Sequence, residues 1–379
     1  RSVVRGNMPR VPEPRVAPSD ASSCSVGKVG RPHDKSPEAD AWAPQQRRVF
    51  VVHGDVGMGL VGVALEASLQ RAGVMAERFK VNGPCSEASV TAIQRATVGA
   101  SVLIGVGGGR VLDATKAAAD ASGAATVLVP TSPATCAAAT AVVVDYTVDG
   151  AYLGSRVVRR APAYTVVEPT VLAAAPDRHL AAGLVDALAK VVEVRFGLAR
   201  QSGAGAAGVA ALALCDELEQ LVFADGPLAL RNSDQDCGKR QLVAEANVLW
   251  PGLIGALAGE GAKLAAAHAV HNALTLLPGV KRSLHGEVLA FGILTQLLLE
   301  GRGADELARH ADLFSRLGCP MTLTALGAGA YWSEAGAKER VLQRACALPS
   351  MTQCFPGSGP EALAAVFAEA DALAADFSR

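Results

Sequence analysis

The stretch SVLIGVGGGRVLDATKAAAD at residues 101–120 decides the fold, because three glycines join a buried strand directly to a helix. The apolar residues 101–104 predict the strand, and residues 113–121 predict the helix. Gly107, Gly108 and Gly109 let the backbone approach a ligand closely, and the amides at the start of a helix favour an anion. The turn is not the usual GxGxxG, and tight packing alone is the alternative. We interpret it as a clamp for a pyrophosphate group.

Strands and helices alternate around this turn. Strands are expected at residues 49–52, 76–81, 101–104 and 125–129, then at 141–146, 151–154 and 165–168, with helices at 58–72, 86–96 and 113–121. Nearly everything after Thr170 is expected to be helical. The pattern predicts an α/β Rossmann-like parallel sheet domain, residues 46–169, followed by an all-α domain, residues 170–379.

Composition narrows the function. Half of the 379 residues are apolar and the net charge is −1, so nothing favours binding to nucleic acid or to a membrane surface. No apolar run reaches the roughly 20 residues that span a bilayer. The eight cysteines form no CxxC pair, which fits free thiols in the cytoplasm.

Residues 1–45 are rich in Pro, Ser, Arg and Gly, and we predict that they are disordered. They lack the apolar core of a secretory signal. Their Arg/Ser bias leaves organellar targeting open as an alternative to a cytoplasmic location.

Polar residues follow the first and fourth strands. Asp55 is placed to accept from the ribose hydroxyls of an adenosine, or to act as a helix N-cap, and the residues do not decide between the two. Thr131, Ser132 and Thr135 can hydrogen-bond a phosphate or a nicotinamide, or can simply form a turn.

Residues 264–287, LAAAHAVHNALTLLPGVKRSLHGE, hold three of the chain's seven histidines. His268 and His271 share one helical face, and His285 opens a second apolar helix after a Pro-Gly break. Buried imidazoles need partners, so we favour a shared metal ion over satisfied core histidines. Asp186, in another apolar helix, is either the third ligand or the ion-pair partner of Lys190.

These motifs together resemble a known family. The chain resembles the glycerol dehydrogenase group of metal-dependent, iron-containing alcohol dehydrogenases, within the dehydroquinate-synthase-like fold. The resemblance runs from about Arg48 to the C-terminus through GVGGGRVLDATK, VPTSPATCAAATA, EPTVLAAAPDRHLAAGLVDALAK, AAAHAVHNALTLLP and LHGEVLAFGIL. Around TCAA, DALAK and AAAHAVHNALTLLP it is similar to hydroxycarboxylate (2-oxo acid) dehydrogenases.

The resemblance implies metal ligation by Asp186, His268 and His285, with His271 as a proton relay and Asp186 also near the substrate. Besides Gly107 and Gly108, which the turn itself indicates, it implies nucleotide contacts from Asp55, Gly109, Arg110, Val111, Leu112, Asp113, Thr131, Ser132, Thr135, Thr140, Val142 and Tyr146. Of these, Thr140, Val142 and Tyr146 come from the family alone. A homo-oligomer is also expected.

Three features depart from the family pattern, two at single positions and one in a whole strand. Cys136 stands where glycerol dehydrogenases carry an aspartate that touches substrate, and Val185 replaces the glycine before the metal-binding aspartate. The family's first strand has no counterpart in residues 1–45.

The expected function is a metal-dependent NAD(P)-linked oxidoreductase that interconverts a secondary alcohol, either a 2-hydroxy acid or a polyol, and its carbonyl compound. The expected cofactors are NAD(H), with NADP(H) as the alternative, and one divalent metal, Zn²⁺ before Fe²⁺ or Mn²⁺. The alternatives are glycerol dehydrogenase proper, a dehydroquinate synthase-like cyclase, and a degenerate non-catalytic member. A cyclase needs a basic cluster for a substrate phosphate, and the metal region offers only Lys190, Lys263, Lys281 and Arg282.

Lys190 and Cys136 together bear on the substrate. An ammonium near the metal and the loss of an anion at position 136 favour an anionic 2-oxo acid over a neutral polyol. Alternatively, Lys190 pairs only with Asp186 or Glu193 and never meets the substrate.

Overall fold

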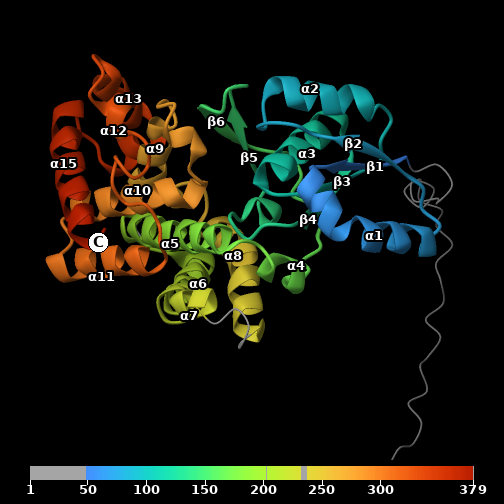
Figure 1. The fold of residues 1–379 in the computed structure, drawn as a ribbon, viewed down its shortest axis with the longest axis horizontal. Helices are drawn as coiled ribbons and strands as arrows, with labels where there is room; N and C mark the ends of the chain where they lie inside the picture. The colour runs from blue at the N-terminus through green and yellow to red at the C-terminus, as the bar shows by residue number, and fades with distance from the viewer. Residues whose placement is uncertain (1–47, 202, 232–236, 379) are drawn as a thin grey trace, which may run out of the picture. The chain divides into compact units, whose positions relative to one another are not determined.

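The computed structural model describes residues 48–201, 203–231 and 237–378, so the predictions for residues 1–45 lie outside the described part. The chain has the predicted order, with an α/β region followed by helices (Figure 1). Among the described helices, none is both long and apolar enough to cross a membrane.

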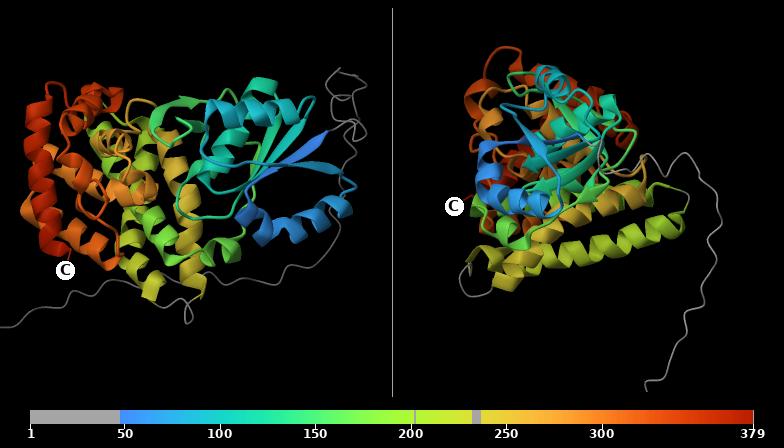
Figure 2. Two further views of the ribbon diagram at one scale, coloured as in Figure 1. Left: turned by 45° about the horizontal axis from the view of Figure 1, so that its top comes forward. Right: turned by 90° about the vertical axis from the view of Figure 1, so that its right-hand side faces the viewer.

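The first half contains a five-stranded parallel sheet in the order β2-β1-β3-β4-β7. The strands are β1 Val49–His53, β2 Ala76–Lys80, β3 Val102–Gly107, β4 Ala125–Pro130 and β7 Tyr164–Thr165. Alternate side chains of β1 enter two separate cores: Val49 and Val51 pack with residues of α1, whereas Phe50 and Val52 pack with residues of α3. Helix α1, Asp55–Arg71, therefore covers one face, and α2, Glu87–Ala96, and α3, Gly109–Ser122, cover the other (Figures 1 and 2).

Several elements differ from their predicted ranges: α1 begins at Asp55 and the strand predicted at 151–154 extends to Val157, and two further differences bear on the site. Helix α3 begins at Gly109, earlier than predicted, so the glycine turn itself forms the start of the helix. The strand predicted at 165–168 is wrong beyond Thr165, because the Glu168 side chain instead accepts the Thr170 N–H and caps α4, Pro169–Ala173. The strands β5, Val142–Tyr146, and β6, Tyr152–Val157, form a separate antiparallel hairpin.

The second half is helical, as predicted. Its longer helices are α5 Asp177–Ala199, α6 Gly205–Ala224, α8 Cys237–Ala258, α9 Ala266–Leu274, α10 His285–Leu299, α11 Ala304–Arg316, α13 Ala337–Ala347 and α15 Pro360–Phe377. Short helices α7 Gly226–Arg231, α12 Gly329–Trp332 and α14 Pro349–Cys354, with 3-10 turns η3 Ala137–Ala139 and η4 Val280–Arg282, complete the chain. Helix α5 is central, because it packs against α6, α8 and α10 at once.

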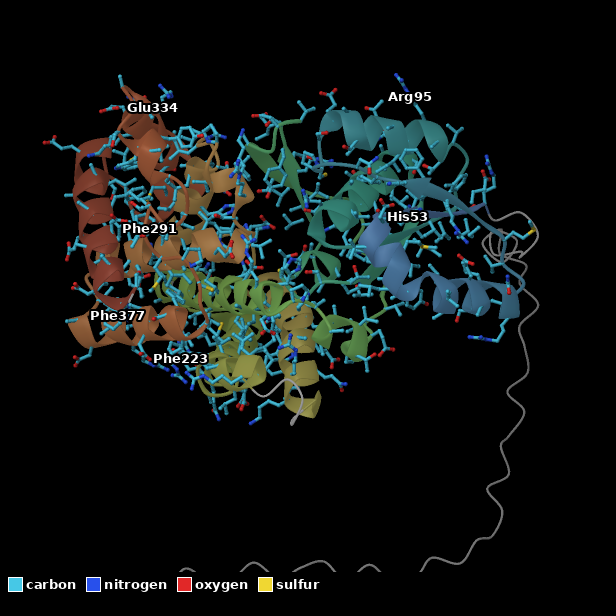
Figure 3. The ribbon with its side chains drawn as sticks, viewed as in Figure 1. His53, Arg95, Phe223, Phe291, Glu334 and Phe377 are labelled. Carbon is cyan, nitrogen blue, oxygen red and sulfur yellow. The ribbon has the colours of Figure 1, made fainter. Side chains whose placement is uncertain are left out.

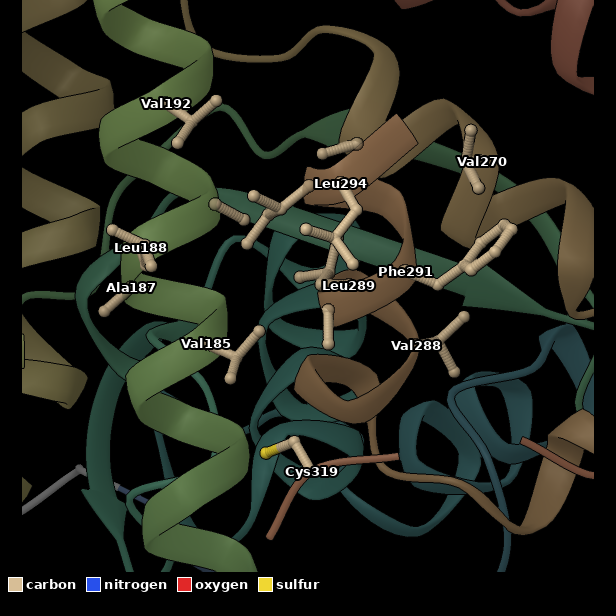
Figure 4. Close-up of a cluster of buried hydrophobic side chains, with 14 of the residues drawn as sticks. Val185, Ala187, Leu188, Val192, Val270, Val288, Leu289, Phe291, Leu294 and Cys319 are labelled. Carbon is tan, nitrogen blue, oxygen red and sulfur yellow. The ribbon is translucent and has the colours of Figure 1, made fainter. Parts of the chain in front are cut away.

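Val185 belongs to the core between α5 and α10. Its side chain is fully buried, and Figure 4 shows it on the side of α5 that faces Leu289 and Leu294 of α10. Helix α5 continues unbroken through this position. A valine in place of the family's glycine is therefore accommodated as a core residue and leaves the helix intact.

Glycines allow the loop after β4 and the start of α10 to approach the backbone of α5 closely. A Cβ added to Gly183 would lie 1.9 Å from the carbonyl oxygen of Pro133, and one added to Gly286 would lie 1.8 Å from that of Ala182. The loop after β4 and the start of α10 consequently touch neighbouring positions of α5. Side chains carried by these three segments are brought to one place.

This packing predicts opposite effects of two alanine substitutions. Gly286→Ala forces α10 away from α5, and we expect it to lower the free energy of unfolding by about 1–3 kcal/mol or more. Gly59→Ala, in the exposed part of α1 with no atom within 4 Å of the added carbon, should raise it by about 0.5–1 kcal/mol. Urea unfolding of both variants checks this, and equal effects would contradict the close crossing.

Candidate metal centre and nucleotide site

The carboxyl ends of β1, β3 and β4 meet at the glycine turn. A Cβ added to Gly57, in the first turn of α1, would lie 3.0 Å from Gly107 Cα and 3.1 Å from Thr131 Oγ1. One added to Gly109 would lie 2.9 Å from Thr135 Oγ1. The structure thus brings together the glycines and the hydroxyl residues that the sequence assigned to nucleotide binding, at the amino end of α3 where backbone amides favour an anion.

Asp55 lies beside this turn but is not an N-cap. It is the first residue of α1, the cap position is Gly54, and Val111 of α3 packs next to Gly54. The exposed Asp55 carboxylate lies 2.5 Å from the ammonium of Lys80. Lys80 ends β2 opposite His53, which ends β1 and is labelled in Figure 3. No sequence pattern points to Lys80, because only the sheet register places it beside Asp55.

Asp113 is turned into the protein. Its carboxylate is buried, lies 2.9 Å from the Lys116 ammonium and accepts the Val144 N–H at 3.2 Å. Burial raises the pKa of Asp113, and Lys116 opposes that rise. The fully buried Lys116 also donates to the carbonyls of Thr140, at 3.1 Å, and Val142. This pair holds the loop that carries the family-derived positions 140 and 142, so Asp113 has a structural role in addition to its predicted nucleotide contact.

The remaining predicted nucleotide residues have different surroundings. Arg110 is exposed at the start of α3, whereas Leu112 is buried in the large core. Ser132 Oγ lies 3.0 Å from His179 Nδ1. Burial raises the pKa of the Tyr146 phenol, so the phenol stays neutral. The backbone N–H of Tyr146 donates to the Cys85 carbonyl.

Three helices place the predicted metal ligands together. His285 Nε2, at the start of α10, lies 3.2 Å from Asp186 Oδ1 of α5, and His268 Nε2 of α9 lies 4.0 Å from the same oxygen. One ligand atom from each residue lies within 4.8 Å of the others. Burial favours the neutral acid, but in the metal-free protein the positive charges of His285 and His268, when they are protonated, and of Lys190 outweigh it and lower the pKa of Asp186.

Hydrogen bonds set which nitrogen of each histidine faces this centre. His268 Nδ1 lies 2.6 Å from Glu193 Oε2, and a carboxylate can only accept, so the proton is on Nδ1 and the Nε2 lone pair is free. His271 Nδ1 donates to Asn272 Oδ1 at 2.9 Å, which leaves its Nε2 to accept from His285 Nδ1 at 2.9 Å. With Nδ1 protonated in both His268 and His285, the Nε2 lone pairs of these two residues are on the side of Asp186. This arrangement fits a metal ion bound between the three side chains.

His271 itself is buried behind His285. Burial, and the positive charge that His285 carries when it is protonated, keep the pKa of His271 well below its usual value, so His271 is neutral and able to accept a hydrogen bond. Because it contacts His285 directly, it is placed to carry out the relay role that the family implies, and also to orient that ligand.

The start of α10 is fixed by an ion pair that the sequence did not reveal. Arg178 of α5 donates to both oxygens of the buried Glu287, at 2.5 and 2.7 Å. Glu287 in turn accepts the Leu284 N–H at 2.7 Å, immediately before His285. The two partners are 109 residues apart in the chain, and only the packing of α10 on α5 brings them together.

Lys190 and Cys136 also lie near Asp186. The Lys190 ammonium donates to the Lys263 carbonyl at 2.6 Å, and no ion pair joins it to Asp186 or Glu193 in the described part of the chain. Its charge nevertheless lowers the pKa of both carboxyls. Burial, and then the charge of Asp186, raises the pKa of Cys136 to about 12, so position 136 presents a neutral thiol.

Comparison with known proteins identifies the same family as the motifs. A family model described as iron-containing alcohol dehydrogenase matches residues 40–176. A glycerol dehydrogenase of Escherichia coli O6:H1 is 33% identical over 339 residues, covering 86% of this chain and 90% of that protein. Hydroxycarboxylate dehydrogenase A of E. coli K12 is 35% identical over 260 residues, covering 66% of this chain and 70% of its own.

Solved structures agree with the sequence matches. The crystal structure of a probable glycerol dehydrogenase from Sinorhizobium meliloti 1021 has a TM-score of 0.76 at 28% identity, covering 89% of this chain and 94% of that chain. Glycerol dehydrogenase from Schizosaccharomyces pombe has the same TM-score at 25% identity, covering 89% and 86%. The chain belongs to the iron-containing alcohol dehydrogenase family, and its activity class is that of an NAD-linked alcohol oxidoreductase.

Proposed function

We propose that this protein interconverts a secondary alcohol and its carbonyl compound with NAD(H), using one divalent metal ion held by Asp186, His268 and His285. The observation that carries the proposal is the convergence of three ligand atoms within 4.8 Å from three separate helices. His268 Nδ1 is hydrogen-bonded to Glu193, and His285 Nδ1 is hydrogen-bonded to His271. The Nε2 atom of each imidazole is therefore free to bind the metal. Two neutral imidazoles and one carboxylate leave coordination positions open, as a catalytic metal requires.

The donor set favours Zn²⁺, and Fe²⁺ or Mn²⁺ would also fit nitrogen and oxygen ligands. When bound, such an ion supplies Lewis acidity at the substrate oxygen. The chain itself supplies the charge of Asp186 and a low-polarity surrounding in which that charge acts strongly.

For the cofactor, we assign the pyrophosphate to the turn Gly107–Gly108–Gly109 and the start of α3, with Thr131, Ser132 and Thr135 beside it. Asp55 is placed to accept from the adenosine ribose. Its charge opposes a 2′-phosphate, although Lys80 beside it weakens that effect.

For the substrate, we propose an anionic 2-oxo acid or 2-hydroxy acid. A neutral thiol at position 136 removes one source of repulsion. Lys190 uses one N–H on Lys263, and an ammonium has two more to offer a carboxylate. The similarity to hydroxycarboxylate dehydrogenase A supports this class, and the similarity to glycerol dehydrogenases supports a polyol as the second candidate.

The ligand assignment predicts that Asp186→Ala, His268→Ala and His285→Ala each contain less than one metal ion per chain and lose hydride transfer. His271→Ala should still load metal but react more slowly. Elemental analysis of purified proteins after dialysis measures this. His310→Gln is the matched control, because His310 is buried in α11 with Nδ1 bonded to the Glu306 carbonyl. Full occupancy in Asp186→Ala would refute the assignment.

The charges beside the ribose predict cofactor choice. Wild type should bind NADH more tightly than NADPH. Asp55→Asn should reduce the ratio of the NADPH to the NADH dissociation constant by about five-fold, equivalent to about 1 kcal/mol for an exposed charge. Lys80→Met should widen the ratio, because it removes the positive charge that offsets Asp55. Fluorescence titration with NADH and NADPH gives both dissociation constants. An unchanged ratio in Asp55→Asn would show that this carboxylate does not discriminate.

The substrate assignment predicts a selective effect of Lys190→Met. A partly desolvated charge pair contributes about 1.5–3 kcal/mol, so kcat/KM for 2-oxobutyrate should fall about 10- to 100-fold while that for a neutral aldehyde changes much less. Each substrate serves as the other's control within one variant. Equal losses on both would mean that Lys190 only supports the Lys263 loop, and a wild-type preference for glycerol would exclude the anionic class.

A further inference from the structure

The amino end of α9, which carries His268, has no cap of its own. Its N-cap residue is Ala265, which makes no side-chain cap hydrogen bond, and the residues around it are alanines. The first N–H groups of a helix have no partner within the helix. In a buried position they must find acceptors elsewhere in the fold.

Side chains from two other helices supply these acceptors. Glu193 Oε1 of α5 accepts the N–H of Ala265 at 2.8 Å and of His268 at 3.0 Å. Gln296 Oε1 of α10 accepts the N–H of Ala267 at 2.9 Å. Both side chains are fully buried, so each is an interior cap provided by a neighbouring helix.

Glu193 differs from Gln296 in what its second oxygen does. Glu193 Oε2 lies 2.6 Å from His268 Nδ1, whereas the Gln296 amide nitrogen donates to Glu300 Oε1 at 2.9 Å. One carboxylate therefore sets both the position of the α9 backbone and the tautomer of the histidine on it. The proton on Nδ1 leaves Nε2 free to face Asp186.

We propose that Glu193 is a positioning residue that holds His268 in its metal-binding tautomer, while Gln296 only caps the same helix end. The inference rests on the proposed function, because it gives the metal affinity of this site a dependence on a residue outside the ligand set. Partners of this kind typically contribute 10- to 100-fold to metal affinity or activity.

Glu193→Gln separates the two roles of the carboxylate. If the amide oxygen keeps the two backbone N–H groups, the amide nitrogen faces His268 Nδ1 as a donor, and the imidazole proton must move to Nε2. If the amide turns around, the helix end loses its acceptor. In the first orientation the volume and the cap are conserved and only the tautomer changes.

The experiment compares Zn²⁺ dissociation constants, from chelator competition, for wild type, Glu193→Gln and Gln296→Leu, together with the unfolding temperatures of the metal-free proteins. We expect Glu193→Gln to weaken Zn²⁺ binding about 10- to 100-fold. Gln296→Leu should lower the unfolding temperature and leave the dissociation constant near that of wild type. Unchanged binding in Glu193→Gln, or equal weakening in both variants, would overturn the proposal.

A measurement without metal keeps this inference separate from the proposed function. Long-range ¹H–¹⁵N spectra of the metal-free protein report histidine tautomers, and His268→Gln identifies the signal. We expect the Nδ1–H form in wild type and the Nε2–H form in Glu193→Gln. An Nε2–H form in wild type would refute the role of Glu193. The Nδ1–H form in a wild type that binds no stoichiometric metal would instead refute the metal-dependent function alone.

Discussion

The carboxylate of Asp186, buried in the central helix α5, is the constraint on which the rest of the helical region depends. A charge in such surroundings is costly unless cations or strong donors face it. The chain prepares a site for such a cation with His268 and His285, which come from two other helices and whose Nε2 atoms lie 4.0 and 3.2 Å from Asp186 Oδ1, where a metal ion would be shared by all three. Positioning α9 and α10 around one oxygen is therefore also what builds the candidate metal centre.

Close backbone contact makes that arrangement possible. Gly183 of α5 lies against the loop after β4, and Gly286 of α10 lies against Ala182, the residue before Gly183, so both contacts occur within one turn of Asp186. The loop follows β4 of the parallel sheet and carries Thr131, Ser132 and Cys136. A single short section of α5 thus brings the expected nicotinamide loop and the metal ligands into contact with one helix.

Much of this could be predicted from local pattern. Apolar runs and glycines predicted the sheet and the turn at Gly107, and clustered histidines in an apolar stretch pointed to the residues that the structure gathers into the candidate metal centre. What the sequence did not reveal are the supporting pairs: Lys80 with Asp55, Arg178 with Glu287, and Glu193 with His268. Each joins residues far apart in the chain, so no periodicity marks it. Glu193 did carry one signal, as a carboxylate among the valines at 191, 192 and 194, but its partner depended on how α9 packs.

The same helix face also bears on substrate charge. Three charged residues of α5 follow one another at roughly helical-turn spacing, and their side chains lie on the face that packs near α9 and the metal centre: Asp186, Lys190 and Glu193. Two carboxylates balance a divalent ion, and burial makes full balance necessary. Lys190 then adds a positive charge. Within the described part of the chain, its ammonium donates one hydrogen bond, to the Lys263 carbonyl. A family relative with an aspartate in place of Cys136 would cancel that charge, whereas the neutral thiol of this chain leaves the charge available to the carboxylate of the proposed substrate.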